Sequence, residues 1–361
     1  MHAMSELFYN LVSFQNLHRA YLDARSGKRY RDAILRFGCA KETNILWLQE
    51  ELMRRTYRHG PYREFIVTDS KKRVIKAAPF RDRVVHHAVV NIIEPIFEKA
   101  FIFDSYACRR GKGTHRAIKR LEHFIRSLQS RCAVAVEQCG GGYCLKCDIS
   151  KYFDSIDHGV LFRILAKRIG DENVLWLLRE IIESSDKGIP IGNLTSQLFA
   201  NVYLHELDWF VKRTLREHYY LRYMDDFVIL GADKRHLDNV REVVRAFLRD
   251  ELKLTLHPKK SDIFPIETGV DFLGYVLRDG KRFVRKSTVK RMIKKRRYYE
   301  QLVRKGTMSE ERLQSALTSW RGYMRFAHAY GLMKKLGFMG EGEKLKISSS
   351  AQATNSTHAI S

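Results

Sequence analysis

Residues 219–230 read Tyr219-Tyr220-Leu221-Arg222-Tyr223-Met224-Asp225-Asp226-Phe227-Val228-Ile229-Leu230. Both halves of this stretch are rich in β-branched and aromatic residues, which predicts two paired strands. The connection between them lacks the Gly or Asn that a two-residue hairpin turn usually carries. We therefore predict a tight β-hairpin that presents Asp225 and Asp226 at its tip, where chemistry rather than turn geometry has set the sequence.

A third carboxylate lies upstream, where a short apolar strand ends in Leu145-Lys146-Cys147-Asp148-Ile149-Ser150-Lys151-Tyr152-Phe153-Asp154. Phosphoryl transfer builds negative charge on the attacking and leaving oxygens, and two metal ions about 4 Å apart stabilise both. Mg²⁺ suits this role because it binds a few carboxylates and keeps its other positions for water and phosphate. Asp148, Asp225 and Asp226 together predict a two-metal site for nucleotide polymerisation. The competing interpretation is a solvated turn for the Asp pair and a helix cap for Asp148.

The composition favours a globular protein with a polyanionic partner. The chain has 361 residues, of which 45% are hydrophobic, and its 65 Lys and Arg against 41 Asp and Glu give a net charge of +24. Nucleic acid is the predicted partner. No apolar run approaches the ~18 residues that span a membrane, so we expect no membrane association. Six cysteines are too few for a disulfide scaffold in a chain of this size, which favours the cytoplasm.

The organisation along the chain predicts alternating helical and hairpin segments. Residues 1–60 are expected to be a helical extension packed on a larger body, and residues 62–78 a second hairpin. Further helices are expected from about residue 82, within 160–182 (interrupted at Gly170-Asp171), after the break at 188–192, and over 236–252. Residues 281–297 hold ten Lys or Arg and no acid. The segment from about residue 341 is poor in apolar residues and is expected to be disordered.

Three further stretches carry a family resemblance: residues 77–87 (AAPFRDRVVHH), residues 106–115 (YACRRGKGTH) and residues 191–197 (IGNLTSQ). With the two aspartate motifs, their order and spacing resemble the reverse transcriptases, and among these the enzymes of diversity-generating retroelements. Retron and group II intron enzymes mostly carry Gln where this chain has Ile191 and Pro where it has Gln197.

The resemblance implies an α/β (α+β) right-hand polymerase fold with fingers, palm and thumb. The implied boundaries are an N-terminal extension (1–60), interleaved fingers and palm with an antiparallel sheet (61–275), a basic helical thumb (276–338) and a tail (339–361).

The resemblance also implies roles for individual residues. Asp148, Asp225 and Asp226 would be catalytic and, with Ile149, would hold two Mg²⁺ ions, for which Mn²⁺ could substitute. The dNTP site would comprise Arg73, Phe153 as a steric gate against ribose, Ile191, Gln197 and Lys260. Nucleic acid would contact Arg109, Arg110, Lys112, Tyr223, Gly274, Lys290, Lys294 and Arg297. The structural alternatives are a core aromatic for Phe153 and a solvated basic loop around Lys260.

The implied function is RNA-directed synthesis of cDNA with errors opposite template adenine, for targeted sequence diversification by a bacterial or phage-encoded element. Its partners would be template RNA, the RNA/DNA duplex, dNTPs and a basic oligomeric accessory protein. Two alternatives stay open: a retron or phage-defence reverse transcriptase, and a non-catalytic, maturase-like RNA-binding protein.

Overall fold

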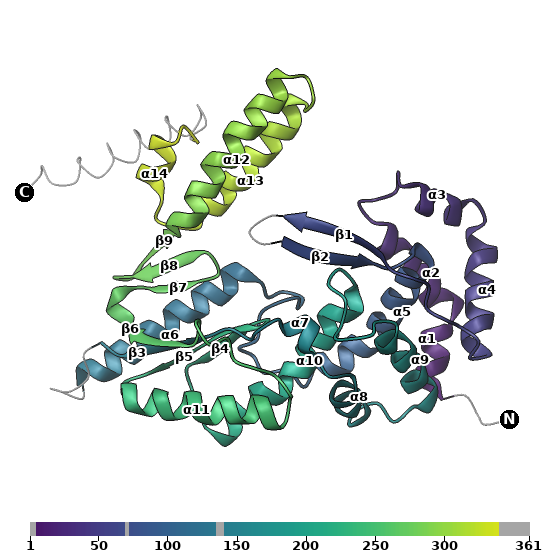
Figure 1. Cartoon of the computed structure of the whole chain (residues 1–361), viewed down its shortest axis with the longest axis horizontal. Helices are drawn as coiled ribbons and strands as arrows, with labels where there is room; N and C mark the ends of the chain where they lie inside the picture. The colour runs from purple at the N-terminus through teal and green to yellow at the C-terminus, as the bar shows by residue number, and fades with distance from the viewer. Residues whose placement is uncertain (1–4, 69–71, 135–140, 339–361) are drawn as a thin grey trace, which may run out of the picture. The chain divides into compact units, whose positions relative to one another are not determined.

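The computed structural model describes residues 5–68, 72–134 and 141–338, and the tail expected to be disordered (339–361) lies outside these ranges. The chain forms two compact units (Figure 1). Unit 1 comprises Met1–Ala117 and Tyr143–Ile263, and unit 2 comprises Ile118–Gly142 and Phe264–Ser361. Among the described residues, no helix combines the length and the apolar character needed to cross a bilayer.

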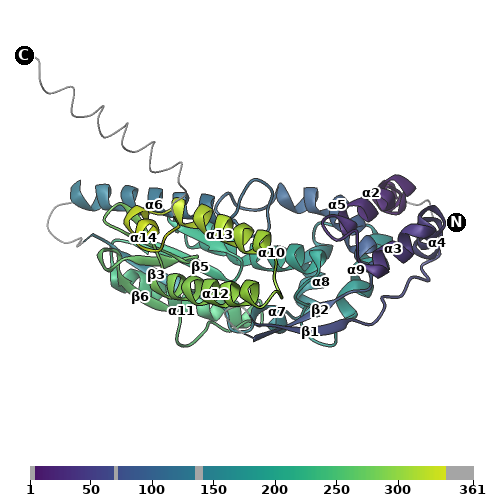
Figure 2. The same ribbon diagram turned by 90° about the horizontal axis from the view of Figure 1, so that it is seen from above.

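The first helices of unit 1 are α1 (Glu6–Val12), α2 (Phe14–Arg25), α3 (Asp32–Cys39) and α4 (Lys41–Met53), which confirms the helical prediction for the N-terminal segment. Ser5 and Ser13 cap α1 and α2 because their hydroxyls accept backbone N–H groups of the first turns. Figures 1 and 2 both show α2 beside the long helix α5 (Phe80–Glu98), which it contacts along its length.

The second predicted hairpin is confirmed as β1 (Arg63–Thr68) and β2 (Lys72–Ala77), an antiparallel pair in which Val67 faces Arg73. Every residue of β1 is exposed. The strand β1 therefore has no buried apolar face, whereas Ile75, Lys76 and Ala77 of β2 are half-buried.

The central sheet of unit 1 has the strand order β4-β5-β3-β6, formed by β4 (Tyr220–Tyr223), β5 (Asp226–Gly231), β3 (Tyr143–Cys147) and β6 (Asp262–Pro265). The helices that follow or precede these strands are α7 (Tyr152–Ser155), α8 (His158–Ala166), α9 (Glu172–Glu183), α10 (Leu194–Trp209) and α11 (Lys234–Asp250). α10 continues into a π-helical turn, η1 (Phe210–Thr214). The predicted catalytic hairpin is confirmed, and the one or two helices predicted within 160–182 are two, α8 and α9.

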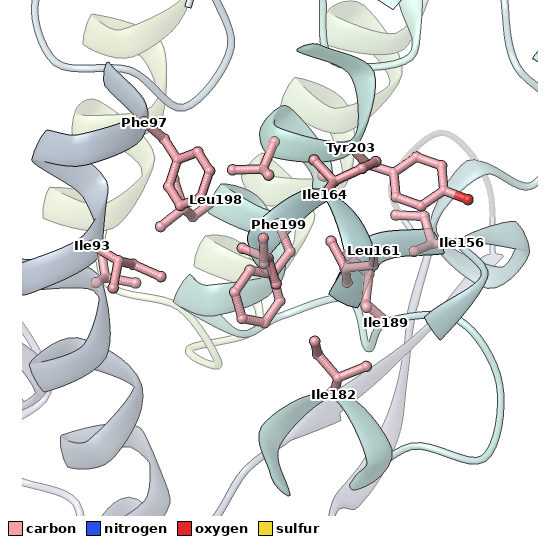
Figure 3. Packing of buried hydrophobic residues seen from close by; sticks show 14 of the residues in the cluster. Ile93, Phe97, Ile156, Leu161, Ile164, Ile182, Ile189, Leu198, Phe199 and Tyr203 are labelled. Carbon is pink, nitrogen blue, oxygen red and sulfur yellow. The ribbon is translucent and has the colours of Figure 1, made fainter. Parts of the chain in front are cut away.

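Helix α10 lies at the centre of the apolar core. Figure 3 shows Phe199 of α10 between Ile93 of α5 and Leu161 of α8, with Ile189 close to Leu161. These side chains are at most 3% exposed. Ile189, in the segment that leads into α10, is therefore packed in the apolar core.

Unit 2 contains most of α6 (Thr114–Val134), the short 3-10 helix η2 (Ile266–Thr268), the strands β7 (Val270–Phe272), β8 (Tyr275–Arg278) and β9 (Lys281–Val284), and the helices α12 (Lys286–Arg304), α13 (Glu310–Arg325) and α14 (Tyr330–Lys335). The three strands pair in the order β7-β8-β9. The sequence placed a boundary between residues 275 and 276, which falls inside β8. Backbone pairing joins residues 270–284 in one sheet, and the first residues of the basic run, Lys281–Val284, form its last strand.

Candidate active site

The catalytic hairpin turns through two residues only. Tyr223 pairs with Asp226, which leaves Met224 and Asp225 as the turn. Met224 has φ of 56°, whereas Asp225 is not among the residues with positive φ. A positive φ at the first turn residue alone is the pattern of a type II′ turn, where glycine is preferred. Met224 therefore holds a conformation that is unfavourable for a side chain with a Cβ, as functional turns often do.

The strand register brings the third carboxylate to this turn. Cys147 of β3 pairs with Phe227 of β5, so Asp148 follows β3 at the level of Asp226. Burial raises the pKa of Asp225 to about 6, and the negative charges of Asp226 and Asp148 raise it too. The charge of Arg73, which is exposed on β2, acts in the opposite direction. The strand register therefore brings together the three predicted catalytic aspartates.

Lys260 also reaches this group, because its ammonium forms an ion pair with the carboxylate of Asp148. The loop that carries it is tied to the segment after β3. The His257 N–H donates to the Asp148 carbonyl at 2.8 Å, and the Ser150 N–H donates to the Thr255 carbonyl at 2.9 Å. Lys260 is thus held at the site, which favours the predicted role over a purely solvated loop.

The donor set is one that a hard divalent cation prefers. Three carboxylates lie at the end of the hairpin and of β3, and the pKa of Asp225 is raised first by burial and then by the negative charges of Asp226 and Asp148. Within the described residues, no three His, Cys, Asp or Glu side chains form a ready-made metal cage. Mg²⁺ fits such a partial set, since it is commonly held by one or two carboxylates and completes its shell with water and substrate phosphates.

The segment 188–192 connects the predicted steric gate to the β1–β2 hairpin. The Ile189 N–H donates to the Phe153 carbonyl at 2.9 Å, and the Lys76 N–H of β2 donates to the Ile191 carbonyl at 3.1 Å. Phe153 and Ile191 are half-buried, and Gln197 is exposed in the first turns of α10. Backbone hydrogen bonds thus join the segment 188–192, which contains Ile191, to Phe153 on one side and to β2 on the other.

The Arg109 side chain, predicted to contact nucleic acid, is instead bound within the protein. Its side chain is only 5% exposed, and its guanidinium is held by the Glu98 carboxylate at 2.7 Å, by the Ile102 and Ser105 carbonyls and by the Ser105 hydroxyl. These partners occupy the donors that a phosphate would need. Arg109 therefore stabilises the loop 101–113, and the prediction that it contacts nucleic acid is not supported.

The neighbouring predicted contacts lie at the surface of the same loop or beside it. The Arg110 side chain is 78% exposed and lies 3.6 Å from the Glu94 carboxylate. The Lys112 ammonium lies 3.6 Å from the centre of the Phe103 ring. The Tyr223 hydroxyl accepts a hydrogen bond from the Thr114 hydroxyl at 3.2 Å. Arg110 keeps the accessibility that a nucleic-acid contact requires, whereas Lys112 is half-buried and its ammonium donates to the Phe103 carbonyl at 2.8 Å.

The remaining predicted contacts belong to unit 2. Gly274 has φ of 89° in the β7–β8 turn, and a Cβ there would lie 2.3 Å from the Tyr323 hydroxyl, so glycine is required. Three basic residues line a shallow groove of about 540 Å³ on α12: Lys290, Lys294 and Arg297. They form one continuous cationic helix face.

A basic groove that the sequence did not reveal lies in unit 1, between α3 and the base of the β1–β2 hairpin. We call it the arginine groove; it has a volume of about 740 Å³ and is lined by Arg31, Arg36, Arg63 and Arg83, with Asp32 as its single acid. Burial lowers the pKa of Arg83, and the charge of Arg31 lowers it further. In the described part of the chain, the Arg83 Nε atom is buried and has no acceptor. Repelling, incompletely paired guanidinium groups favour an anionic ligand.

A second feature missed from the sequence is a buried ion pair under the hairpin, between Arg222 of β4 and Asp208 of α10. Both side chains lie among buried apolar residues, Tyr220 and Leu221 for the arginine and Leu204 and Leu207 for the aspartate. A charged residue inside the short apolar strand β4 was the available signal in the sequence.

Comparisons with known proteins show the family of this chain. A family model described as reverse transcriptase (RNA-dependent DNA polymerase) matches residues 67–277. Protein YkfC of Escherichia coli (strain K12) is 28% identical over 277 residues, which cover 64% of this chain and 70% of that protein. The group II intron-encoded protein LtrA of Lactococcus lactis subsp. cremoris is 25% identical over 333 residues, covering 71% of this chain and 53% of LtrA. The chain thus spans about half the length of LtrA.

Among solved structures, telomerase from Candida albicans in complex with a fragment of telomeric RNA aligns with a TM-score of 0.48 and 12% identity, over 81% of this chain and 62% of that one. The family match covers more than half of the chain and includes every strand that carries the aspartates. Reverse transcriptase domains depend on divalent metal ions, in keeping with the donor set described above. The chain belongs to the reverse transcriptase family, whose members are RNA-dependent DNA polymerases.

Proposed function

We propose that this protein copies the template RNA of its own retroelement into cDNA in the cytoplasm, with errors concentrated opposite template adenine. The observation that carries the polymerase assignment is the convergence of Asp148, Asp225 and Asp226 at the hairpin tip, within the segment that matches the family. The apolar side chain of Ile191, where retron and group II intron enzymes mostly carry Gln, supports the error-prone version.

Each residue at the site has a part in this chemistry. Asp148, Ile149, Asp225 and Asp226 would hold two Mg²⁺ ions, or Mn²⁺ in their place, which when bound supply the positive charge that phosphoryl transfer requires. Arg73 would bind the triphosphate through its planar guanidinium. A ring at Phe153 would lie beneath the sugar and exclude a ribose 2′ hydroxyl. Lys260 would donate a proton to the departing pyrophosphate, and Gln197, exposed in the first turn of α10, would belong to the same dNTP site.

Template RNA, an RNA/DNA duplex and dNTPs are the proposed partners, with a basic oligomeric accessory protein. A net charge of +24 supports binding to a polyanion. A retron or phage-defence enzyme and a maturase-like RNA-binding protein are the alternatives. The similarity to an intron-encoded protein supports the maturase-like alternative in part, whereas the three clustered acids would weaken a surface that only bound RNA.

Primer extension tests the proposal. The purified protein is incubated with a primed RNA that contains all four bases, Mg²⁺ and dNTPs, and the cDNA is sequenced. Errors concentrated opposite adenine would support the diversity-generating function. Accurate cDNA would leave a polymerase of another reverse transcriptase class, and failure to make cDNA, even with a candidate accessory protein, would favour the RNA-binding alternative.

The identity of residue 191 should control the error spectrum. We expect Ile191→Gln to lower misincorporation opposite adenine by about fivefold, because a side-chain amide restores a hydrogen bond of about 1 kcal/mol that a hydrocarbon cannot make. Ile191→Val, which keeps a branched apolar side chain, is the matched control. Sequencing of cDNA from both variants measures the effect, and an unchanged spectrum with Gln would remove Ile191 from the explanation.

The arginine groove should bind single-stranded RNA. We expect the double variant Arg31→Ala/Arg36→Ala to weaken binding of a single-stranded RNA about tenfold. The slope of log K against the logarithm of the salt concentration should become less negative by about 1.4, because each phosphate contact on a single strand contributes about 0.7 to that slope. Arg54→Ala/Arg249→Ala removes the same charge from exposed helix ends outside the groove. Equal losses in the two double variants would show that net charge alone matters.

A further inference from the structure

The ion pair between Arg222 and Asp208 is completely buried beneath the catalytic turn. The Arg222 Nε donates to Asp208 Oδ1 at 2.7 Å and Nη2 donates to Asp208 Oδ2 at 2.6 Å, and both side chains are 0% exposed. Such parallel bonds fix the plane of the guanidinium. A buried ion pair is weak evidence for stabilisation of the fold, because desolvation of two charges opposes their attraction. The contacts of the third guanidinium nitrogen point to another role.

That third nitrogen holds the turn. Arg222 Nη1 donates to the Met224 carbonyl at 3.1 Å and to the Asn201 side-chain oxygen at 3.2 Å. Met224 is the turn residue with positive φ, so Arg222 stabilises the backbone where it is least favourable.

The peptide group between Met224 and Asp225 links this contact to the catalytic carboxylate. Its carbonyl is the acceptor for Arg222, and its N–H belongs to Asp225. Rotation of this peptide plane would therefore move the backbone of Asp225 and, with it, the Cα–Cβ bond that directs its carboxylate.

The same network ties the hairpin to the loop that carries Lys112. The Asn201 amide donates to the Ala107 carbonyl at 2.9 Å, the Arg222 N–H donates to the Asp104 carbonyl at 2.9 Å, and the Tyr106 N–H donates to the Arg222 carbonyl at 3.0 Å. Arg222 thus contacts the turn through its side chain and the loop through its backbone.

We propose that Arg222, anchored by Asp208, is a positioning residue that fixes the Met224–Asp225 peptide group and thereby sets the Asp225 carboxylate for divalent-metal binding. This inference rests on the proposed function only in that Asp225 is taken as a metal ligand. Arg222 itself touches neither metal nor nucleotide.

The primary variant is Arg222→Lys, which keeps the charge but cannot make the fork of bonds to Asp208 and the bond to Met224 together. The matched control is Tyr220→Phe. The Tyr220 hydroxyl donates to Asp208 Oδ1 at 2.6 Å, so this variant also removes a buried hydrogen bond from the ion pair while leaving the Arg222–Met224 contact in place.

Metal affinity is measured directly by Mn²⁺ titration with electron paramagnetic resonance, with Asp225→Asn as the reference for a lost ligand. We expect Arg222→Lys to weaken Mn²⁺ binding about tenfold and to lower kcat by a similar factor, with the KM for dNTP and the affinity for primed RNA within about twofold. Tyr220→Phe should retain the Mn²⁺ affinity and kcat of the unaltered protein. A folded Arg222→Lys variant with unchanged Mn²⁺ affinity would overturn the proposal, whether or not the protein polymerises DNA.

Rescue by glycine separates positioning from general damage. Met224→Gly removes the Cβ that disfavours positive φ, so it should restore at least part of the Mn²⁺ affinity in the Arg222→Lys background and none in the Asp225→Asn background. If thermal unfolding shows that Arg222→Lys does not fold, Asp208→Asn weakens the same anchor with little change in shape, and the rescue is measured there. Equal losses with and without the Met224→Gly substitution would overturn the proposal. An unaltered protein that binds Mn²⁺ through Asp225 but makes no cDNA would instead contradict the proposed function alone.

Discussion

We expect Asp225→Asn to reduce DNA synthesis by at least about 1,000-fold and to leave RNA binding within about twofold. A 1,000-fold loss corresponds to about 4 kcal/mol of transition-state stabilisation. The amide keeps the shape of the side chain but lacks the charge that holds a divalent cation. Binding of RNA depends on cationic surface, so removal of one acid should not weaken it.

The fold should not suffer in this variant. The raised pKa of Asp225 shows that its charge is disfavoured by burial and by Asp226 and Asp148, so a neutral residue relieves repulsion. The melting temperature is therefore expected to equal or exceed that of the unaltered protein. Asp250→Asn, at an exposed helix end, controls for loss of an acid. Full cDNA synthesis by the folded Asp225→Asn variant would refute the assignment of the metal site.

The sequence predicted those strands, turns and helix ends that depend on residues next to one another in the chain. The hairpin around Met224 and Asp225 follows from strand propensity on both sides of a two-residue turn, and the register with Asp148 follows once both strands enter one sheet. The β1–β2 hairpin was predictable from a change in the spacing of apolar residues. The break between α8 and α9 was predictable from Gly170, a residue that disfavours helix.

Features that depend on long-range packing were not predictable in the same way. Arg109 lies in a basic motif that suggests phosphate contacts, and only the fold brings Glu98 and the loop carbonyls around it. Arg222 and Asp208 are far enough apart in sequence that no periodicity links them. The β7–β9 sheet joins a glycine turn to the start of the basic run, whereas the resemblance implied a helical thumb from residue 276 onward.

The second large effect is expected at Gly188, which supports the backbone of the proposed steric gate. Gly188 has φ of +60°, and a Cβ there would lie 2.3 Å from the Phe153 carbonyl oxygen and 2.7 Å from the Asp154 Cα. Both obstacles are backbone atoms, which cannot rotate away as a side chain would. We expect Gly188→Ala to lower the free energy of unfolding by about 3 kcal/mol or more, from the left-handed backbone and the overpacking together.

Gly170→Ala is the matched control, since it adds the same methyl group in open space at an exposed position without positive φ. Its stability, measured by denaturant unfolding, should be unchanged or up to about 1 kcal/mol higher, because alanine restricts the unfolded chain. The folded fraction of Gly188→Ala should also incorporate ribonucleotides more readily relative to deoxynucleotides, because the added methyl group displaces the backbone that carries Phe153. Lost stability with unaltered sugar selection would leave Gly188 as a packing residue and would place the exclusion of ribose elsewhere than on Phe153.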